Sequence, residues 1–161
     1  MIQASLHVDE GLQLDNQLCF KLYAASRAVI RAYKPMLDQL GLTYPQYLAM
    51  LVLWEWQQQP QPQPPALPTV KALGERLLLD SGTLTPLLKR LEMQGLLQRQ
   101  RSASDEREVH LALTPAGGAL REQVLPLKSQ LLCERGIDLD QVAVLRSQVG
   151  VLLDQFMALN H

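Results

Sequence analysis

The sequence has few of the residues that build disulfide or metal sites. Its 161 residues include two cysteines, Cys19 and Cys133, and three histidines. The cysteines lie 114 positions apart, and neither has another Cys or a His at the spacing of metal ligands. We therefore predict no disulfide framework, no metal and no cofactor, which leaves redox chemistry or packing as the role of the two thiols.

Long apolar runs are also missing. The longest, Tyr47 to Trp54, is far shorter than the ~20 residues that cross a bilayer. The N-terminal sequence, MIQASLHVDE, lacks both the basic and the apolar region of a secretory signal. We therefore expect a cytoplasmic protein with no membrane partner.

Net charge is nearly absent, but basic charge is concentrated in one segment. The whole chain carries −1, whereas residues 89–101 carry +3. Because 47% of the residues are apolar, the chain is long enough and apolar enough for one domain with a sizeable core. A local basic segment on such a domain suits a polyanion such as DNA, whose phosphates Lys and Arg neutralise.

This segment lies within a predicted helix-turn-helix. Asp80-Ser81-Gly82 is the expected turn between two helices. The apolar stripe of the first helix is Val70, Leu73, Leu77 and Leu78. The stripe of the second helix is Leu84, Leu87, Leu88 and Leu91. The second stripe has the i, i+3, i+4, i+7 spacing of a helix with one buried face, and the first also repeats at helical intervals.

A basic hairpin follows the second helix. Gly95 is expected to end that helix, and two extended runs follow at 96–101 and 108–114. A hairpin appended to a helix-turn-helix is a wing, so the predicted class is mainly α with a small β-wing. This series favours DNA binding over the alternative of an ordinary solvated helix face. The candidate DNA-contacting residues here are Ser81, Thr83, Thr85, Lys89, Arg90 and Arg99.

The first predicted helix, residues 14–41, has Asp15 as its expected cap and Pro35 as a point where it bends or restarts. One of its faces carries both Cys19 and Tyr33. Fourteen residues at ~1.5 Å each place these two side chains roughly 21 Å apart along the axis. They therefore cannot touch within one straight helix, but two copies packed antiparallel about a two-fold axis would bring them together.

The remaining segments complete the predicted organisation. A buried helix opens at Pro45, and QQQPQPQPPALPT (57–69) is expected to be an extended spacer rather than a ligand for a proline-binding domain. Residues 45–114 form the predicted winged DNA-binding domain. Long apolar helices in 1–44 and 115–161 form the predicted dimerisation region, so we expect a homodimer bound to double-stranded DNA with an inverted-repeat operator.

The sequence resembles the MarR-type winged-helix regulators and, within them, the OhrR branch that senses organic hydroperoxides. The resemblance runs through LDNQLCFKLY (14–23), AYKPMLDQLGLTYPQYLAMLVLWE (32–55) and residues 70–114, where LDSGTLTPLLKRLE is specific to the branch. The Gln/Pro insert is longer than the family's usual connection. The resemblance implies a repressor released from DNA when organic hydroperoxide oxidises it.

The resemblance also implies roles for individual residues. Cys19 is similar to the peroxide-sensing cysteine, and Tyr33 and Tyr44 to the tyrosines that hydrogen-bond it from the partner subunit. Cys133 resembles the resolving cysteine, which closes an intersubunit disulfide. Asp105 and Arg107 resemble the wing tip, where the arginine enters the minor groove and the aspartate holds it.

Physical chemistry supports the thiol assignment but leaves alternatives. A cysteine near a helix N-terminus is favoured as a thiolate, which peroxide converts to sulfenic acid, although free cysteines are more often inert core residues. A cysteine peroxidase is disfavoured, because residues 15–19 lack the Thr and Arg that would activate the peroxide. The other alternative is a repressor released by a small phenolic or lipophilic ligand.

Overall fold

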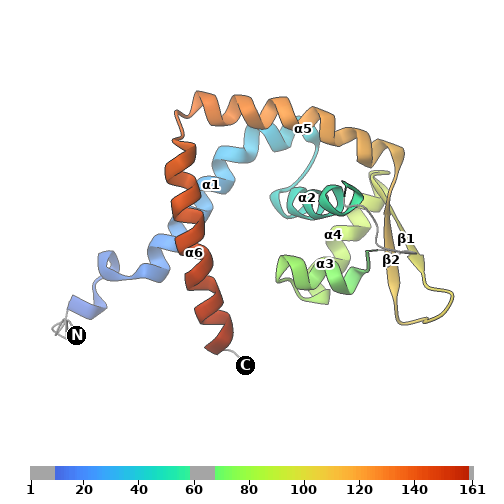
Figure 1. The fold of residues 1–161 in the computed structure, drawn as a ribbon, viewed down its shortest axis with the longest axis horizontal. Helices are drawn as coiled ribbons and strands as arrows, with labels where there is room; N and C mark the ends of the chain where they lie inside the picture. Colours follow the sequence, from blue (N-terminus) through green and yellow to red (C-terminus); the bar gives the residue numbers. More distant parts are fainter. Residues whose placement is uncertain (1–9, 59–67, 160–161) are drawn as a thin grey trace. The chain divides into compact units, whose positions relative to one another are not determined.

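The computed structural model describes residues 10–58 and 68–159 and is mainly helical. Figure 1 shows the two-stranded hairpin beside α2, α3 and α4. The predicted class, mainly α with a β-wing, is confirmed. In chain order the elements are η1 (Glu10–Leu12), η2 (Leu14–Asn16), α1 (Leu18–Leu40), α2 (Tyr44–Gln58), α3 (Val70–Leu77), α4 (Ser81–Met93), β1 (Leu97–Arg101), β2 (Val109–Leu113), α5 (Pro115–Glu134) and α6 (Leu139–Leu159).

Contacts within one chain divide it into two compact units, residues 1–124 and 125–161. The first unit contains α1 to α4, the hairpin and the first half of α5. The second contains the rest of α5 and α6. The predicted division into a dimerisation region and a DNA-binding domain concerns a dimer, so it stays a prediction.

The core of the first unit is built around α2. This helix is apolar on nearly every side, which is typical of a helix surrounded by others. Its start is held by a reciprocal pair: Gln46 Oε1 accepts from the Thr43 amide at 2.8 Å, and Thr43 Oγ1 accepts from the Gln46 amide at 3.4 Å. The leucine stripe of α4 packs in the same core, and its buried members are those predicted: Leu84, Leu87, Leu88 and Leu91.

The turn of the helix-turn-helix lies earlier than predicted. Ser81 and Gly82 belong to the first turn of α4, because Asp80 is its N-cap and accepts from the Thr83 amide at 2.8 Å. The connection is therefore Leu78 to Asp80. Leu78 has a positive φ of 55° and is 55% exposed, so its predicted place in the buried stripe of the first helix was wrong.

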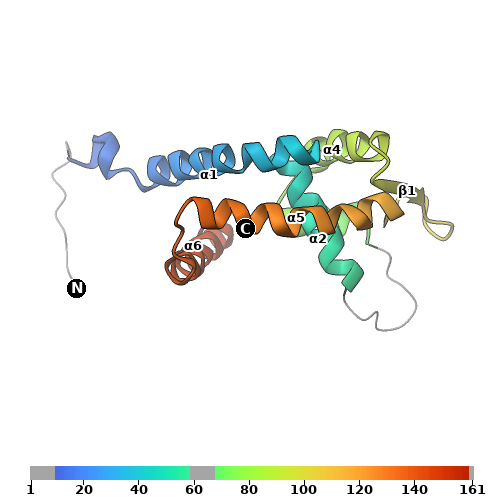
Figure 2. The ribbon, with the colours of Figure 1, turned by 90° about the horizontal axis from the view of Figure 1, so that it is seen from above.

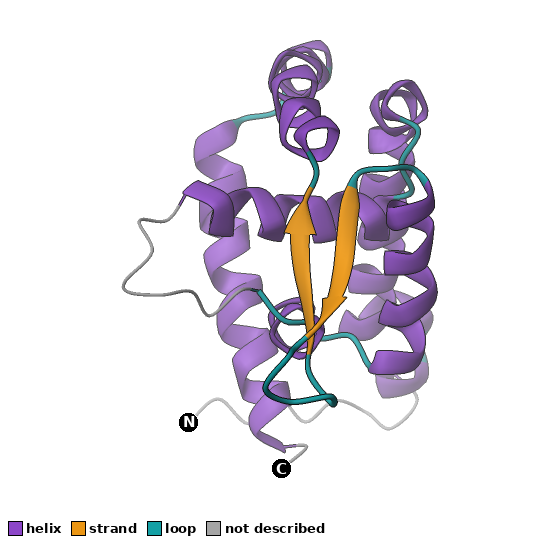
Figure 3. Ribbon diagram, turned by 90° about the vertical axis from the view of Figure 1, so that its right-hand side faces the viewer, coloured by secondary structure: helices purple, strands orange, loops and turns teal. Residues whose placement is uncertain are grey.

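The wing is an antiparallel pair in which Leu97 lies opposite Leu113 and Arg99 opposite Leu111. Figure 3 shows the two strands side by side. β2 also contacts the segment before α3, because the Leu111 amide donates to the Pro68 carbonyl at 2.7 Å. The predicted spacer is thus shorter at both ends: α2 extends to Gln58, and Pro68 belongs to the wing. Its central part, 59–67, lies outside the described residues.

α1 starts later than predicted and does not restart. It begins at Leu18, and Asp15 is not its cap but pairs with Lys21 at 3.2 Å. The helix continues through Pro35 to Leu40, as Figure 2 shows from above. It ends where Gly41 adopts a left-handed conformation with φ of 66°, which glycine reaches without strain.

Two helices leave apolar side chains uncovered in the single chain. Only the last turns of α1 are buried, and no residue of α6 is buried. α6 has the length and mean composition of a membrane-spanning helix, which the short apolar runs did not predict, although Asp140, Arg146 and Asp154 interrupt it. Exposed apolar side chains of these two helices include Leu18, Val29, Ile30, Val144, Leu145, Val151 and Phe156.

The start of α5 is packed tightly against the wing and α2. Thr114 Oγ1 caps the helix by accepting from the Gly117 amide at 3.0 Å, and Pro115 occupies the first helical position. The Gly117 carbonyl accepts from Trp54 Nε1 at 2.8 Å. A Cβ on Gly117 would lie 1.9 Å from the backbone carbonyl of Leu96, so this position has room for glycine alone.

We predict that Gly117→Ala destabilises the fold by about 1–3 kcal/mol, because the methyl group would force two backbone segments apart. Urea unfolding at one protein concentration measures this. Gly118→Ala is the matched control, since its Cβ would meet only the Gln57 side chain at 3.6 Å or more. Equal midpoints for Gly117→Ala and wild type would contradict the close packing.

Candidate functional site

The exposed face of α4 presents polar side chains at helical spacing. Ser81, Thr85 and Lys89 are all exposed, as predicted for a helix whose other face is leucine. Thr83 is exposed too, but its hydroxyl donates to Asp80 Oδ2 at 3.1 Å. Hydrogen bonds from Thr83 hold the pKa of Asp80 below its usual value. Asp80 and Thr83 therefore fix the start of this helix, while the other three residues are available to a partner.

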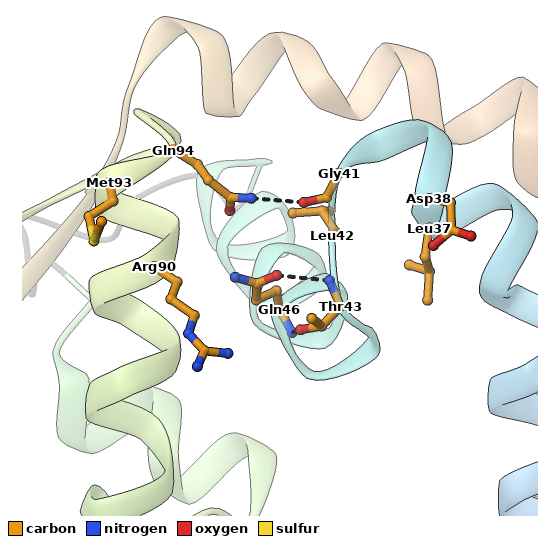
Figure 4. Close-up of a pocket in the computed structure, with 9 residues that line it drawn as sticks. All are labelled: Leu37, Asp38, Gly41, Leu42, Thr43, Gln46, Arg90, Met93 and Gln94. Carbon is orange, nitrogen blue, oxygen red and sulfur yellow. Dashed lines mark hydrogen bonds between the residues drawn. The ribbon is translucent and has the colours of Figure 1, made fainter.

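Arg90 lies on a different side of α4 from this surface. It lines an open groove of about 600 Å³ between the end of α4 and the corner that joins α1 to α2. Figure 4 shows its guanidinium extending from α4 toward Thr43 and Gln46. Gln94 crosses the same groove, where its Nε2 donates to the Gly41 carbonyl at 2.8 Å. The groove thus joins the end of α4 to the α1–α2 corner.

Arg99, predicted to contact DNA, is bound within the protein. Its Nη2 and Nε donate to Glu92 Oε2 at 2.7 and 2.9 Å, and its amide donates to Glu92 Oε1 at 3.1 Å. These bonds hold the pKa of Glu92 below its usual value. Arg99 therefore ties β1 to the end of α4, and we expect it to orient the wing more than to neutralise a phosphate. In the sequence, Glu92 contributed only to the charge count of residues 89–101, and no spacing between residues identified it as the partner of Arg99.

The wing tip is ordered by short-range hydrogen bonds. Asp105 Oδ1 accepts from the Arg107 amide at 2.9 Å, so the aspartate holds the arginine through its backbone. The Ser102 amide donates to the Glu108 carbonyl at 2.9 Å and closes the loop. The Arg107 side chain is exposed at the tip. This loop directs a cation outward from the hairpin.

Cys19 lies in the first turn of α1 and is exposed. The uninterrupted helix confirms the premise of the spacing argument, because a continuous α1 separates Cys19 from Tyr33 by ~21 Å of helix axis. Tyr23 follows Cys19 by one turn and is exposed, and the Arg27 guanidinium lies 5.4 Å from the centre of its ring. In a single chain the thiol therefore faces solvent, remote from Tyr33.

Three tyrosines gather at the other end of α1. Tyr33 meets Tyr44 edge-on at 5.7 Å between ring centres and an angle of 83°. Tyr47 lies 6.0 Å from Tyr33 and 6.3 Å from Tyr44. Burial raises the pKa of Tyr33, and the Tyr44 phenol raises it further. Burial, followed by the Tyr33 and Tyr44 phenols, raises the pKa of Tyr47 to about 12. The structure brings together the two predicted tyrosines, Tyr33 and Tyr44, and adds Tyr47 to them. Only its position one helical turn after Tyr44 could have indicated Tyr47 in the sequence.

Cys133 belongs to the second unit. It lies in the last turn of α5 and is exposed, where an inert core cysteine would be buried. The helix ends just after it: the Gly136 amide donates to the Cys133 carbonyl at 3.1 Å, and Gly136 has a φ of 57°. Both cysteines are thus exposed thiols at helix ends.

Comparison with known proteins gives one family match and a close relative. Residues 31–123 match the family model described as transcriptional regulator SarA/Rot. The chain is 48% identical over 148 residues to the organic hydroperoxide resistance transcriptional regulator of Bacillus subtilis (strain 168). The alignment covers 90% of this chain and 92% of the relative.

Solved structures of AbfR from Staphylococcus epidermidis share the fold. Overoxidized AbfR bound to DNA superposes with a TM-score of 0.73 at 36% identity, covering 92% of this chain and 98% of that one. AbfR with its disulfide formed superposes with a TM-score of 0.61 at the same identity, covering 92% and 95%. The lower score accompanies a different oxidation state of that protein.

We predict that Glu92→Gln loses stability in a pH-dependent way. A carboxylate whose pKa is lowered in the folded state stabilises the protein above its unfolded pKa, and this contribution is lost as pH falls through the folded value. The difference from wild type in urea unfolding should be largest near pH 7 and shrink below about pH 4.3. Glu122→Gln is the control, because the Glu122 carboxylate is exposed and makes a single long contact of 3.5 Å with Arg121, which contributes little to stability. A difference that stays constant with pH would refute the pairing.

Proposed function

The chain belongs to the winged-helix transcriptional regulators of the SarA/Rot and MarR type, and on that premise we propose that it is a redox-sensing repressor. Organic hydroperoxide oxidises Cys19, and Cys133 of the partner subunit then closes a disulfide that releases the protein from DNA. One observation carries this proposal most directly. An exposed thiol lies in the first turn of α1, and Tyr33, toward the far end of the same helix, pairs with Tyr44 at the start of α2.

DNA binding is supported by the surface of the winged unit. Thr85 and Lys89 offer donors and acceptors on the free face of α4, as major-groove base edges require. Arg107 extends from an ordered wing tip, which suits the minor groove. Two of the AbfR structures at 36% identity are bound to DNA, and their fold is shared over most of this chain. The proposed ligand is double-stranded DNA.

A homodimer is supported by the apolar side chains that one chain leaves exposed. Leu18 and Val29 of α1 are 54% and 48% exposed, and Leu145 and Phe156 of α6 are 51% and 55% exposed. Covering such faces is favourable by about 25 cal/mol per Å² of apolar surface. A second copy with two-fold symmetry would cover them and bind an inverted repeat with half-sites roughly 10 bp apart.

In the proposed reaction, the Cys19 thiolate attacks the terminal oxygen of the hydroperoxide. The S–O bond forms as the O–O bond breaks, and the alkoxide takes up a proton to leave as an alcohol. The thiol of the partner's Cys133 then attacks the sulfenic sulfur, forming a disulfide and releasing water. A disulfide needs Cα atoms within about 7 Å, so its formation moves backbone and with it the α4 helices. Each subunit reacts once, as a sensor rather than an enzyme.

The alternative function, a repressor released by a small phenolic or lipophilic ligand, has one observation in its favour. The groove of about 600 Å³ is in the size range of small-molecule sites, and it carries Arg90 between apolar walls that include Leu37 and Met93. DNA binding that responds to such a ligand and ignores hydroperoxide would favour this alternative.

We predict that Lys89→Ala weakens binding to an inverted-repeat operator and reduces the slope of log K against log salt by about one unit, because one phosphate contact is lost. Fluorescence anisotropy across a salt series measures both. Arg135→Ala is the control, because Arg135 is an exposed arginine just after α5, outside the helix-turn-helix and the wing, and it should keep the wild-type slope. An unchanged slope in Lys89→Ala would remove that side chain from the phosphate interface.

We predict that Cys19→Ser binds operator DNA but ignores cumene hydroperoxide, because it lacks the sulfur that is oxidised. Cys133→Ser should still respond, but without a crosslinked dimer. Gel shift and non-reducing electrophoresis of both variants and wild type test this. Release of Cys19→Ser by peroxide would sink the sensor assignment, and a crosslinked band in Cys133→Ser would sink the intersubunit disulfide.

A further inference from the structure

The Tyr47 hydroxyl is the one buried side-chain polar atom for which residues 10–58 and 68–159 supply no hydrogen-bond partner. Tyr47 is 2% exposed and lies in the core on α2. Buried hydroxyls are nearly always hydrogen-bonded, because an unsatisfied one loses its water without compensation. Phenylalanine would fill the same space without this cost. Folding of the single chain therefore gives no reason for the hydroxyl.

The surroundings of Tyr47 indicate what the hydroxyl serves. Its ring contacts Tyr33 and Tyr44, the two tyrosines assigned to the sensing site, with ring centres 6.0 and 6.3 Å away. Both neighbours are only partly buried, so they can present their hydroxyls outward while Tyr47 backs them from the core. A pKa of about 12 keeps Tyr47 protonated, so its hydroxyl is a permanent donor.

We propose that Tyr47 is a positioning residue of the peroxide-sensing site, an inference that rests on the proposed function. The Tyr47 hydroxyl has no partner among the described residues of the single chain. In the dimer, where the Tyr33–Tyr44 pair turns toward the sulfur of the partner's Cys19, this hydroxyl gains a hydrogen bond to one of the two phenols and so fixes the orientation in which that pair donates. Hydrogen bonds in a chain polarise and strengthen one another, so the inner phenol makes the outer ones better donors. A stronger donor favours the thiolate, which is the form that attacks the hydroperoxide.

Tyr47→Phe tests this proposal, because it removes the hydroxyl and keeps the ring contacts. We expect the rate constant for oxidation of Cys19 by cumene hydroperoxide to fall roughly five- to tenfold, the effect of losing about one hydrogen bond. Trapping of the sulfenic acid with dimedone, followed by mass spectrometry, gives that rate in the full-length dimer. Operator affinity of the reduced protein should be unchanged.

Met50→Leu is the matched control, because Met50 is fully buried on the same helix one turn from Tyr47 and lies outside the tyrosine cluster. It should oxidise at the wild-type rate. A Tyr47→Phe rate within twofold of a responsive wild type would overturn this inference alone. Equal slowing in Met50→Leu would overturn it too, by showing a general effect of α2 packing. A wild type whose Cys19 does not react would overturn the proposed function, and this inference with it.

Discussion

The continuity of α1 is the constraint on which the proposed chemistry depends. Met36, Leu37 and Leu40 anchor the end of this helix in the core, whereas the end that carries Cys19 has no buried residue. A rigid helix holds the thiol away from Tyr33 and Tyr44 of its own chain, so in the proposed mechanism the contact between the thiol and these tyrosines is a contact between subunits. Under the proposed mechanism, sensing and dimerisation use the same helix, and a change at the thiol is a change at the interface.

The start of α2 connects this helix to the DNA-binding elements. The Thr43–Gln46 pair fixes the first turn, which carries Tyr44 toward Tyr33 and Tyr47 into the core. The C-terminal end of α4 contacts the corner between α1 and α2, where Gln94 Nε2 donates to the Gly41 carbonyl. Because close-packed helices move as units, a shift of the α1–α2 corner in the proposed switch would be transmitted to α4. The groove beside Arg90 lies along this connection.

Periodic features of the fold could be predicted, whereas features set by a single hydrogen bond could not. The leucines of α4 follow from burial on one face, which a repeating pattern records. The boundary at Asp80 depends on one carboxylate reaching the Thr83 amide, and Ser81-Gly82 reads equally well as a turn. The pairing of Pro68 with Leu111 joins residues 43 positions apart, and a proline-rich segment carries no strand signal.

The predicted site residues divide by the same logic. Surface positions such as Thr85 and Lys89 follow from helical phase, since residues opposite a leucine stripe must face solvent. Arg99 also looked like a free cation, because charge counting does not show which side chains meet in space. Its pairing with Glu92 means that two of the charges counted in the basic segment serve to hold the wing on α4. The pair cancels within the count, so Lys89, Arg90 and Arg101 still carry the +3 of the segment. Orientation of the wing depends on an ion pair that no periodicity records.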